Sequence, residues 1–324
     1  MSSAPLNSKQ LKAEALRLGF HACGLAPAGP VDETFMAHYE NWLRQGRQGE
    51  MHYMENHLNL RRDPRLLLPG TQTVVSLAMS YNPGGADTQK GIAWYAQGKD
   101  YHDVLRERLG ALVSRLSPSP LPPESFRICV DTAPVMEKYW AWRCGLGWIG
   151  RHTQLVIPRR GSAFFLAEIL TTLEADVYDE PRYPTPHHAG CHACHRCLDA
   201  CPTQALSDEG IDARRCLSYL TIEHRGELPP WAKPHLSECF YGCDRCLRAC
   251  PHMRADTPSD ADEEFRPSAE LLAMTPEQWQ TLTPEHYRQL FRGSAVKRAK
   301  YEGLMRNITS PQSDDSKAEP RQPS

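Results

Sequence analysis

No stretch of this 324-residue sequence approaches the about 18 consecutive apolar residues that a membrane-spanning helix requires. The N-terminal residues also lack the basic-then-apolar order of a signal peptide. Net charge is only −2, so any affinity for nucleic acid must come from a local basic patch. We therefore expect a cytoplasmic protein with no membrane partner.

Apolar periodicity and turn signals predict a mixed chain of the α+β class. Hydrophobic residues make up 40% of it and charged residues 23%, which is typical of a packed core. The expected helices are 8–19 with Ser8 as N-cap, 32–45, 101–116, and 134–144, in which Pro134 suits the first turn. The expected strands are 73–79, 126–130 and 164–170.

Four regions follow from these patterns. Residues 1–180 form the α+β domain and residues 181–254 a cysteine-rich module. Residues 255–308 open with an acidic linker and are then expected to be helical, with a basic segment. The polar tail, 309–324, is expected to be disordered.

Twelve cysteines need an explanation in a chain expected in a reducing compartment, where disulfides are rare. Nine of them lie between Cys191 and Cys250, and such clustering indicates metal. The other three, Cys23, Cys129 and Cys144, lie in apolar contexts and are expected to be small core residues.

The first cysteine motif is Cys191-x2-Cys194-x2-Cys197-x3-Cys201-Pro202. This is the bacterial ferredoxin run, in which three cysteines hold one cubane cluster and the fourth holds the other. Zinc is the alternative, but zinc sites use paired Cys-x2-Cys arms and leave a third cysteine and Cys-Pro without a role. We expect Cys201 to begin a helix that points toward the second cluster. The neighbouring histidines are expected to be loop residues rather than ligands: His187, His188, His192 and His195.

The second motif, Cys243-x2-Cys246-x3-Cys250-Pro251, has Phe240 where a further cysteine would complete the run. Exchange of the fourth cysteines gives two 4Fe-4S clusters. The first is held by Cys191, Cys194, Cys197 and Cys250. The second is held by Cys201, Cys243, Cys246 and one more residue. Spacing alone leaves Cys216 and Cys239 open for that position.

Several stretches beyond the cysteines resemble the epoxyqueuosine reductase family, over about residues 8–308. They run from Arg61 to Arg65, Tyr95 to His102, Val130 to Glu137, Gly145 to Gly150, Ile211 to Cys216, Tyr241 to Asp244 and Gly293 to Lys300. The resemblance implies a nitroreductase-like, cobalamin-binding catalytic domain over residues 1–180, followed by the ferredoxin-like two-cluster module. It also implies that Cys216 is the missing ligand and Cys239 a local extra.

The resemblance further implies reduction of epoxyqueuosine to queuosine at the wobble position of tRNA, the final step of queuosine biosynthesis. Low-potential clusters would reduce cobalamin, and a separate low-potential electron donor, not identified from the sequence, would reduce the clusters. Longer family members carry C-terminal helical repeats, and this sequence ends before such a region could form, so we expect tRNA binding that is weaker or differently built. We expect a monomer.

Asp131 matches the family's proposed proton donor. Val130 and the apolar residues after Ala133 could keep its carboxyl group protonated near neutral pH. The alternative is that Asp131 only caps the following helix.

Arg61, Tyr101 and His102 are expected, with Asp131, to line the cobalamin or substrate pocket; ordinary packing or a solvated face is the alternative. The cations Lys297, Arg298, Lys300 and Arg306 are expected to contact tRNA phosphates, with a solvated helix face as the alternative.

Three rival interpretations are open from the sequence. The chain could be a ferredoxin with an extra domain, another corrinoid reductase such as a reductive dehalogenase, or an RNA-binding module with structural clusters. The size of the N-terminal domain argues against the first rival. The lack of an export signal argues against the second.

Overall fold

A four-stranded antiparallel sheet organises the first half of the computed structural model, which describes residues 5–116, 122–253 and 261–310. Its order is β1-β2-β7-β4, with β1 at Ala22–Pro27, β2 at Thr73–Ser80, β7 at Phe164–Thr171 and β4 at Phe126–Cys129. The last three confirm the predicted strands, whereas β1 was not predicted. The α+β class is confirmed.

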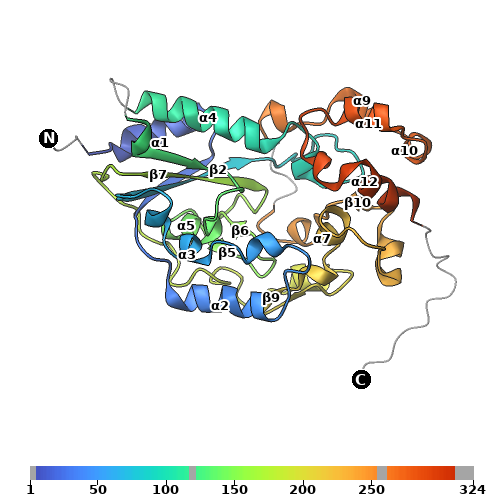
Figure 1. Cartoon of the computed structure of the whole chain (residues 1–324), viewed down its shortest axis with the longest axis horizontal. Helices are drawn as coiled ribbons and strands as arrows, with labels where there is room; N and C mark the ends of the chain where they lie inside the picture. Colours follow the sequence, from blue (N-terminus) through green and yellow to red (C-terminus); the bar gives the residue numbers. More distant parts are fainter. Residues whose placement is uncertain (1–4, 117–121, 254–260, 311–324) are drawn as a thin grey trace.

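Helices cover both faces of this sheet (Figure 1). On one face α1 (Ser8–Arg17) and α4 (Tyr101–Arg115) pack against β2 and β7 around Leu11, Leu105 and Leu109. On the other face lie α2 (Glu33–Arg44) and α5 (Glu137–Arg143), whose Trp140 is buried. Asn7, rather than the predicted Ser8, caps α1, because its Oδ1 accepts a hydrogen bond from the Gln10 N–H.

The helix predicted from Pro134 begins only at Glu137. The chain turns tightly before it, since Thr132 N–H bonds to Val130 O and Val135 N–H bonds to Ala133 O. Asp131, with φ 55°, is in the left-handed region that non-glycine residues seldom adopt. These turns displace the helix start by three residues and leave Asp131 on a loop.

A buried carboxyl group lies in the centre of the sheet. Glu168 of β7 faces Ser76 of β2, whose hydroxyl donates to Glu168 Oε1 across 3.2 Å. Its other oxygen has no hydrogen-bond partner among the described residues. Burial, followed by the charge of Glu137, raises the pKa of Glu168 well above the ordinary value, so the fold favours the protonated form of this carboxyl group.

The cysteine-rich module consists of short elements joined by loops. They are α6 (Arg196–Asp199), β8 (Leu206–Ser207), β9 (Gly210–Ile211), α7 (Leu217–Ile222), β10 (Cys239–Tyr241) and α8 (Arg245–Arg248). The expected helix at Cys201 is wrong, because α6 ends before it. Pro202 disfavours helical backbone at the preceding residue.

The module is joined to the first half of the chain by a parallel pair of strands, β10 and β3 (Gly91–Ile92). The approach is close, since a Cβ at Gly91 would lie 2.0 Å from the Phe240 ring. Phe240 also packs on Trp279, with ring centroids 5.0 Å apart. The position where a ferredoxin run would have a cysteine is therefore a core residue that joins three regions.

The C-terminal region is helical, as predicted, but in four short helices: α9 (Ala269–Ala273), α10 (Pro276–Gln280), α11 (Pro284–Leu290) and α12 (Lys300–Thr309). Asn307 of α12 donates to Thr221 O and Phe240 O, both at 2.8 Å, and so ties the last helix to the module. The predicted break at 117–123, the linker at 254–264 and the tail at 309–324 lie partly outside the described residues; within the described part of the tail, Thr309 is the last residue of α12.

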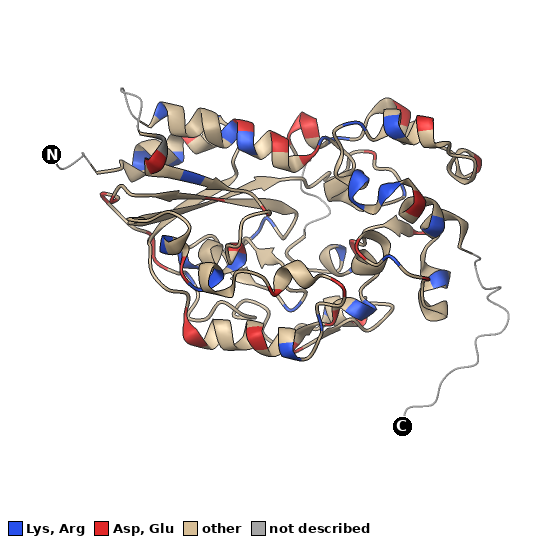
Figure 2. Ribbon diagram, viewed as in Figure 1, with Lys and Arg blue, Asp and Glu red and all other residues tan. Residues whose placement is uncertain are grey.

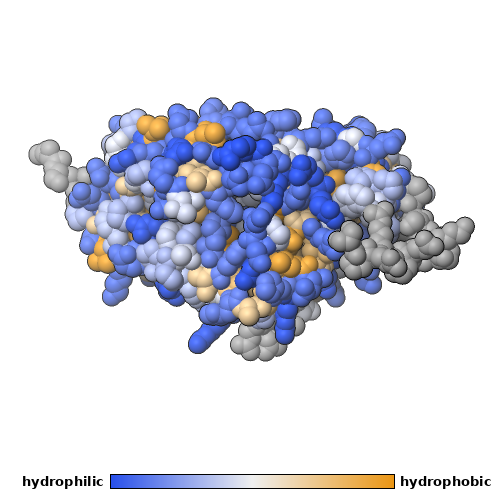
Figure 3. All heavy atoms as spheres, turned by 90° about the horizontal axis from the view of Figure 1, so that it is seen from below, coloured by the Kyte–Doolittle hydropathy of each residue, from blue (hydrophilic) through white to orange (hydrophobic). Residues whose placement is uncertain are grey.

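Remaining elements are α3 (Leu58–Arg62), β5 (Trp148–Ile149) and β6 (Leu155–Val156), with 3-10 helices that include η3 (Trp94–Ala96) and η8 (Ala295–Ala299). In the part of the chain that the structure describes, no helix is long and apolar enough to cross a bilayer. Seen from below, the surface is largely hydrophilic, with apolar side chains exposed in a recess (Figure 3).

Candidate active site and cluster sites

Asp131 lies beside the first turn of α4 rather than at the start of a helix. Its Oδ2 accepts a hydrogen bond from the Tyr101 hydroxyl at 2.7 Å and lies 3.2 Å from His102 Nε2. Met136 occupies the N-cap position of α5 without any side-chain cap bond. The capping alternative for Asp131 is therefore wrong. Its side chain is 57% exposed and free to meet a ligand.

His102 lies between two carboxylates. Its Nδ1 is 2.7 Å from Oδ1 of Asp100, the residue that caps α4. The imidazole ring stacks on Tyr101 at 4.1 Å, and Tyr101 stacks in turn on Phe165 of β7 at 4.4 Å. The stacking on Phe165 thus fixes the Tyr101 and His102 rings against the sheet, and both rings bond to the Asp131 side chain.

These contacts lower the pKa of Asp131. Burial acts to raise it, but the hydrogen bonds from His102 and Tyr101 and the charge of Arg298 outweigh burial. The expectation that apolar neighbours keep this carboxyl group protonated is wrong for the described structure, because its closest neighbours are hydrogen-bond donors. Conversely, hydrogen bonds to Asp100 and Asp131 raise the pKa of His102 to about 9.

The Glu137 side chain bonds to the main chain of the Asp131 loop. Its Oε1 accepts the Asp131 main-chain N–H at 2.8 Å. Burial, followed by the charge of Asp131, raises the pKa of Glu137 above the usual range. No role for Glu137 or Asp100 was predicted from the sequence. The signal for Asp100 was present, since an aspartate directly before a periodic helix is a typical N-cap.

Arg298, predicted to contact tRNA, and Arg61, predicted to line the pocket, both contact Tyr53. Tyr53 is an exposed aromatic residue for which the sequence predicted no role. The Arg298 guanidinium lies over the Tyr53 ring, 5.6 Å from its centroid, and makes two 2.9 Å hydrogen bonds to the Glu223 carboxylate. Arg61 donates to the main-chain oxygen of Tyr53 at 3.4 Å. The charge of Asp131 influences the pKa of Tyr53, so this cluster borders the Asp131 site.

The other predicted tRNA cations divide into two kinds. Lys297 and Lys300 are exposed on the η8–α12 segment, in which basic residues outnumber the single acidic residue Glu302. Figure 2 shows the charged residues on the ribbon. Arg306 instead donates to the main-chain oxygens of Leu220, His224 and Gly226 at 2.7–2.9 Å. Arg306 therefore has a structural role in joining α12 to the module, and contact with tRNA is not required to explain it.

Four cysteines line one small cavity in the module: Cys201, Cys216, Cys243 and Cys246. Burial raises the pKa of Cys216 to about 11, and the nearby Cys243 and Cys201 sulfurs add to the effect. Cys239 does not line this cavity; it lies in β10, and its Sγ donates to His235 O at 3.2 Å. Cys216 therefore lines the cavity with the other three, whereas Cys239 lies outside it with its thiol next to that of Cys243.

The four cysteines predicted for the first cluster, Cys191, Cys194, Cys197 and Cys250, also lie near one another; α6 and α8, which carry or adjoin two of them, pack together. Burial raises the pKa of Cys197 to about 11, and the nearby Cys191 and Cys250 raise it further. Burial likewise raises the pKa of Cys250, and the nearby Cys191 and Cys194 add to this effect. Among the described residues, no three potential ligands converge as tightly as a single metal ion needs. Four thiols spread around a cavity fit a multi-iron cluster.

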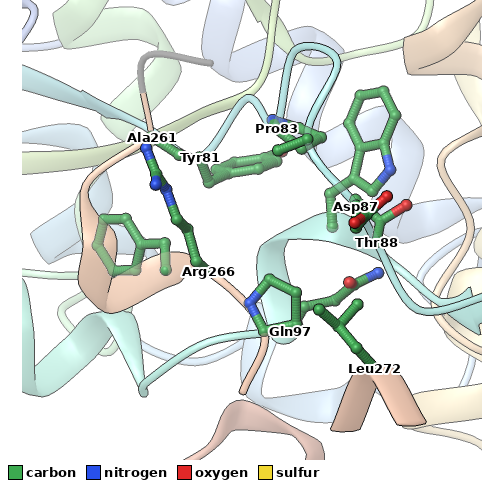
Figure 4. A pocket seen from close by; sticks show the side chains of 12 residues that line it. Tyr81, Pro83, Asp87, Thr88, Gln97, Ala261, Arg266 and Leu272 are labelled. Atoms are coloured by element: carbon green, nitrogen blue, oxygen red, sulfur yellow. The ribbon is translucent and has the colours of Figure 1, made fainter. Parts of the chain in front are cut away.

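A separate cavity of about 180 Å³ lies between the segments 81–97 and 261–272 (Figure 4). Tyr81, Gln97 and Phe265 are among the residues that line it. None of the predicted site residues lines this cavity, so it carries no part of the chemistry described above.

Comparison with known proteins decides the family. The model described as "Epoxyqueuosine reductase QueG, DUF1730" matches residues 61–132, and "4Fe-4S double cluster binding domain" matches residues 190–253. An epoxyqueuosine reductase of Cellulophaga algicola is 40% identical over 95% of this chain and 99% of that protein. The chain belongs to the epoxyqueuosine reductase family. The resemblance seen in the sequence is thereby confirmed.

Solved structures of epoxyqueuosine reductases agree with this. One, in complex with a tRNA-Tyr epoxyqueuosine-modified stem loop, gives a TM-score of 0.81 at 26% identity and covers 93% of this chain and 79% of that chain. A Bacillus subtilis epoxyqueuosine reductase, described with its aspartate catalytic loop swung out of the active site, gives a TM-score of 0.78 at 25% identity over the same shares.

Proposed function

We propose that this protein reduces epoxyqueuosine to queuosine at the wobble position of tRNA, with cobalamin and two 4Fe-4S clusters as cofactors. Membership of the epoxyqueuosine reductase family over almost the whole chain carries the proposal. Two arrangements of this chain support it: an aspartate held next to an imidazole, and two groups of four cysteines.

The overall reaction consumes two electrons and two protons and releases the epoxide oxygen as water. When bound, cobalamin supplies a strongly nucleophilic cobalt centre once it is reduced. The residues of this chain have the remaining tasks. Asp131 delivers a proton to the departing oxygen, and Tyr101 and His102 orient its carboxyl group. We infer that the segment from Asp131 to Met136 corresponds to the aspartate catalytic loop described for the Bacillus relative.

The cluster ligands that we propose are the two groups that the fold gathers. Cys191, Cys194, Cys197 and Cys250 hold one cluster. Cys201, Cys216, Cys243 and Cys246 hold the other. Electrons enter from a low-potential donor.

The residues near β5 fit a large polar cofactor such as cobalamin, which presents many amide oxygens and a phosphate. Trp148 Nε1, Arg151 Nε and His187 Nε2 are buried and have no hydrogen-bond partner among the described residues. They lie close along the chain path, since Ile149 forms a bridge with His187. Such groups are costly to bury unless a ligand or water pairs with them. We propose that they, with Arg61, Tyr101 and His102, contact cobalamin. All except His187 of the cysteine-rich module belong to the nitroreductase-like domain over residues 1–180.

We propose that tRNA lies against η8 and the start of α12, with Lys297, Arg298 and Lys300 at its phosphates. Arg298 connects this surface to the Asp131 site through Tyr53. A monomer in the cytoplasm would suffice for this reaction.

Mass analysis of tRNA nucleosides from cells that lack the protein tests the function. Epoxyqueuosine should accumulate and queuosine should disappear, and expression of the protein should restore queuosine. Normal queuosine in the deleted strain, with no other reductase of this family present, would overturn the proposal.

A further inference from the structure

The contacts of His102 decide where its protons lie. Asp100 Oδ1 accepts the main-chain N–H of His102 at 3.0 Å and is 2.7 Å from Nδ1. An ionised carboxylate can only accept hydrogen bonds, so Nδ1 must carry a proton. The side chain of Asp100 is only 27% exposed and caps α4, which fixes this geometry.

The second ring nitrogen of His102, Nε2, also lies next to a carboxylate oxygen. Asp131 Oδ2 already accepts the Tyr101 hydroxyl at 2.7 Å, and it is 3.2 Å from His102 Nε2. Hydrogen bonds from His102 and Tyr101 lower the pKa of Asp131 despite its burial, so its carboxyl group is taken as ionised and can only accept; Nε2 is then the donor of the Nε2···Oδ2 contact. A ring that donates from both nitrogens is an imidazolium, so the transferable proton of this pair resides on His102 and not on Asp131.

The charges around the ring agree with this. Asp100 and Asp131 contact it directly, and Glu137 lies farther away behind the Asp131 loop. The positive groups in the vicinity are Arg106, which acts on Asp100, and Arg298, which acts on Asp131. Carboxylates predominate next to the ring, and hydrogen bonds to them raise the pKa of His102 to about 9.

We propose that His102 supplies the proton that Asp131 delivers to the substrate oxygen, and that Asp100 holds the ring in place for this transfer. The proposal rests on the proposed function. The His102 Nε2 proton moves to Asp131 Oδ2, and the Asp131 carboxyl group transfers it to the epoxide oxygen.

Both carbon–oxygen bonds break, a carbon–carbon double bond forms, and the oxygen leaves as water with two protons. The two electrons come from the reduced cofactors of the proposed function. Solvent water returns a proton to the neutral His102 ring after each transfer, so the same route supplies both protons.

Burial distinguishes His102 from the other acids nearby. Its side chain is 20% exposed, compared with 57% for Asp131, so a substrate that covers Asp131 would leave its protonated partner in place behind it. Glu137 bonds to the main-chain N–H of Asp131 and not to its carboxylate, so it has no direct path for a proton to Oδ2.

Two measurements on the holoprotein test the proposal. The first is an NMR titration of ¹⁵N-labelled histidine, assigned with His102→Gln. We expect the His102 ring to titrate at about 9, and to fall toward the ordinary value of about 6.5 in Asp131→Asn. Titration of His102 near the ordinary value in the unsubstituted protein would overturn the proposal, whatever the activity.

The second measurement is single-turnover reduction of epoxyqueuosine tRNA by chemically reduced enzyme as a function of pH. His102→Gln keeps a donor toward Asp131 but cannot release a proton. We expect its rate at pH 7 to fall by about 10²-fold and to lose the decline above about pH 9 that the unsubstituted enzyme shows. His286→Gln, at an exposed His–Glu pair of α11, is the matched control and should behave like the unsubstituted enzyme.

Failure of the His102 proposal can be distinguished from failure of the proposed function. If the unsubstituted enzyme converts the substrate and His102→Gln matches its rate at every pH, His102 is not the proton source. If the unsubstituted enzyme, loaded with both cofactors, converts no epoxyqueuosine tRNA, the proposed function itself is overturned, and the proton route with it.

Discussion

The carboxylate of Glu137 accepts a hydrogen bond from the main-chain N–H of Asp131, with 2.8 Å between Oε1 and the nitrogen. Asp131 has φ 55°, a conformation that costs a non-glycine residue free energy and must be held by its surroundings. Glu137 therefore stabilises the loop in the position that brings the Asp131 side chain to His102.

Replacement of Glu137 distinguishes its role as a hydrogen-bond acceptor from its role as an ionisable group. Glu137→Gln keeps an oxygen acceptor and should retain most of the single-turnover rate, whereas Glu137→Ala should lose about 10-fold or more because the Asp131 loop is released. Iron content should be unchanged in both variants. Equal, large losses in Gln and Ala would show that the ionisable carboxyl group of Glu137, and not only its hydrogen-bond acceptor, is needed.

Asp131→Asn tests proton delivery. Asparagine can still bond to Tyr101 but provides no acid, so we expect single-turnover reduction of epoxyqueuosine tRNA to fall by about 10²–10⁴-fold. Chemical reduction of the enzyme removes electron delivery as a variable, and the variant should bind both clusters and cobalamin. Near-normal conversion would mean that the proton comes from another group.

Iron analysis distinguishes the two candidate ligands of the second cluster. The anaerobically purified protein should contain about eight iron atoms per chain, from two four-iron clusters. Cys216→Ala should contain about half of that, because Cys216 lines the cavity with Cys201, Cys243 and Cys246. Cys239→Ala is the matched control and should keep both clusters. The reverse pattern would contradict the proposed ligand set.

Salt dependence tests the proposed tRNA surface. In Lys297→Ala/Lys300→Ala, tRNA affinity should fall, and the slope of log affinity against log salt should become shallower by about one for each phosphate that is no longer neutralised. Addition of Arg298→Ala should weaken binding further, although this residue also pairs with Glu223. Lys9→Ala, an exposed cation on α1, serves as the control. An unchanged slope would assign the segment to a solvated helix face.

The buried Glu168 predicts a pH dependence of stability. The unfolded chain releases this proton at a pKa of about 4.3, while the folded chain keeps it to a much higher pH because burial raises the pKa. The folded state thus binds more protons, so stability is greatest below the unfolded pKa and is lost as pH rises toward the folded one.

Glu168→Gln removes that contribution. Relative to the unsubstituted protein, it should gain up to about 1.4 kcal/mol in the free energy of unfolding for each unit of rising pH. Anaerobic thermal unfolding from about pH 5 to pH 8 measures this difference. A constant difference over that range would mean that Glu168 is ionised in the folded protein.

Local patterns in the sequence predicted those parts of the structure that depend on local spacing. The apolar runs at 73–79 and 164–170 became β2 and β7, and the ferredoxin spacing identified the cysteines that the fold gathers. Strand β1 was missed because Ala22, Gly24 and Ala26 have small side chains with little β propensity.

Contacts between distant segments could not be read from the sequence. The Asp131 carboxyl group bonds to Tyr101 and His102, two residues of α4. Nothing in the sequence around Asp131 indicates that these residues would lower its pKa. Cys216 reaches its cavity through the turn before α7, a path that spacing does not specify. Sequence similarity supplied that assignment where physical reasoning from spacing left two options.

The parallel pairing of β3 with β10 bears on how the protein is made. A ribosome releases β3 long before β10, so the early half of the nascent chain waits with one strand unpaired. The two bonds from Asn307 to Thr221 and Phe240 form only after α12 has been made. A translation product that stops before β10 would therefore present an open strand edge to chaperones and proteases.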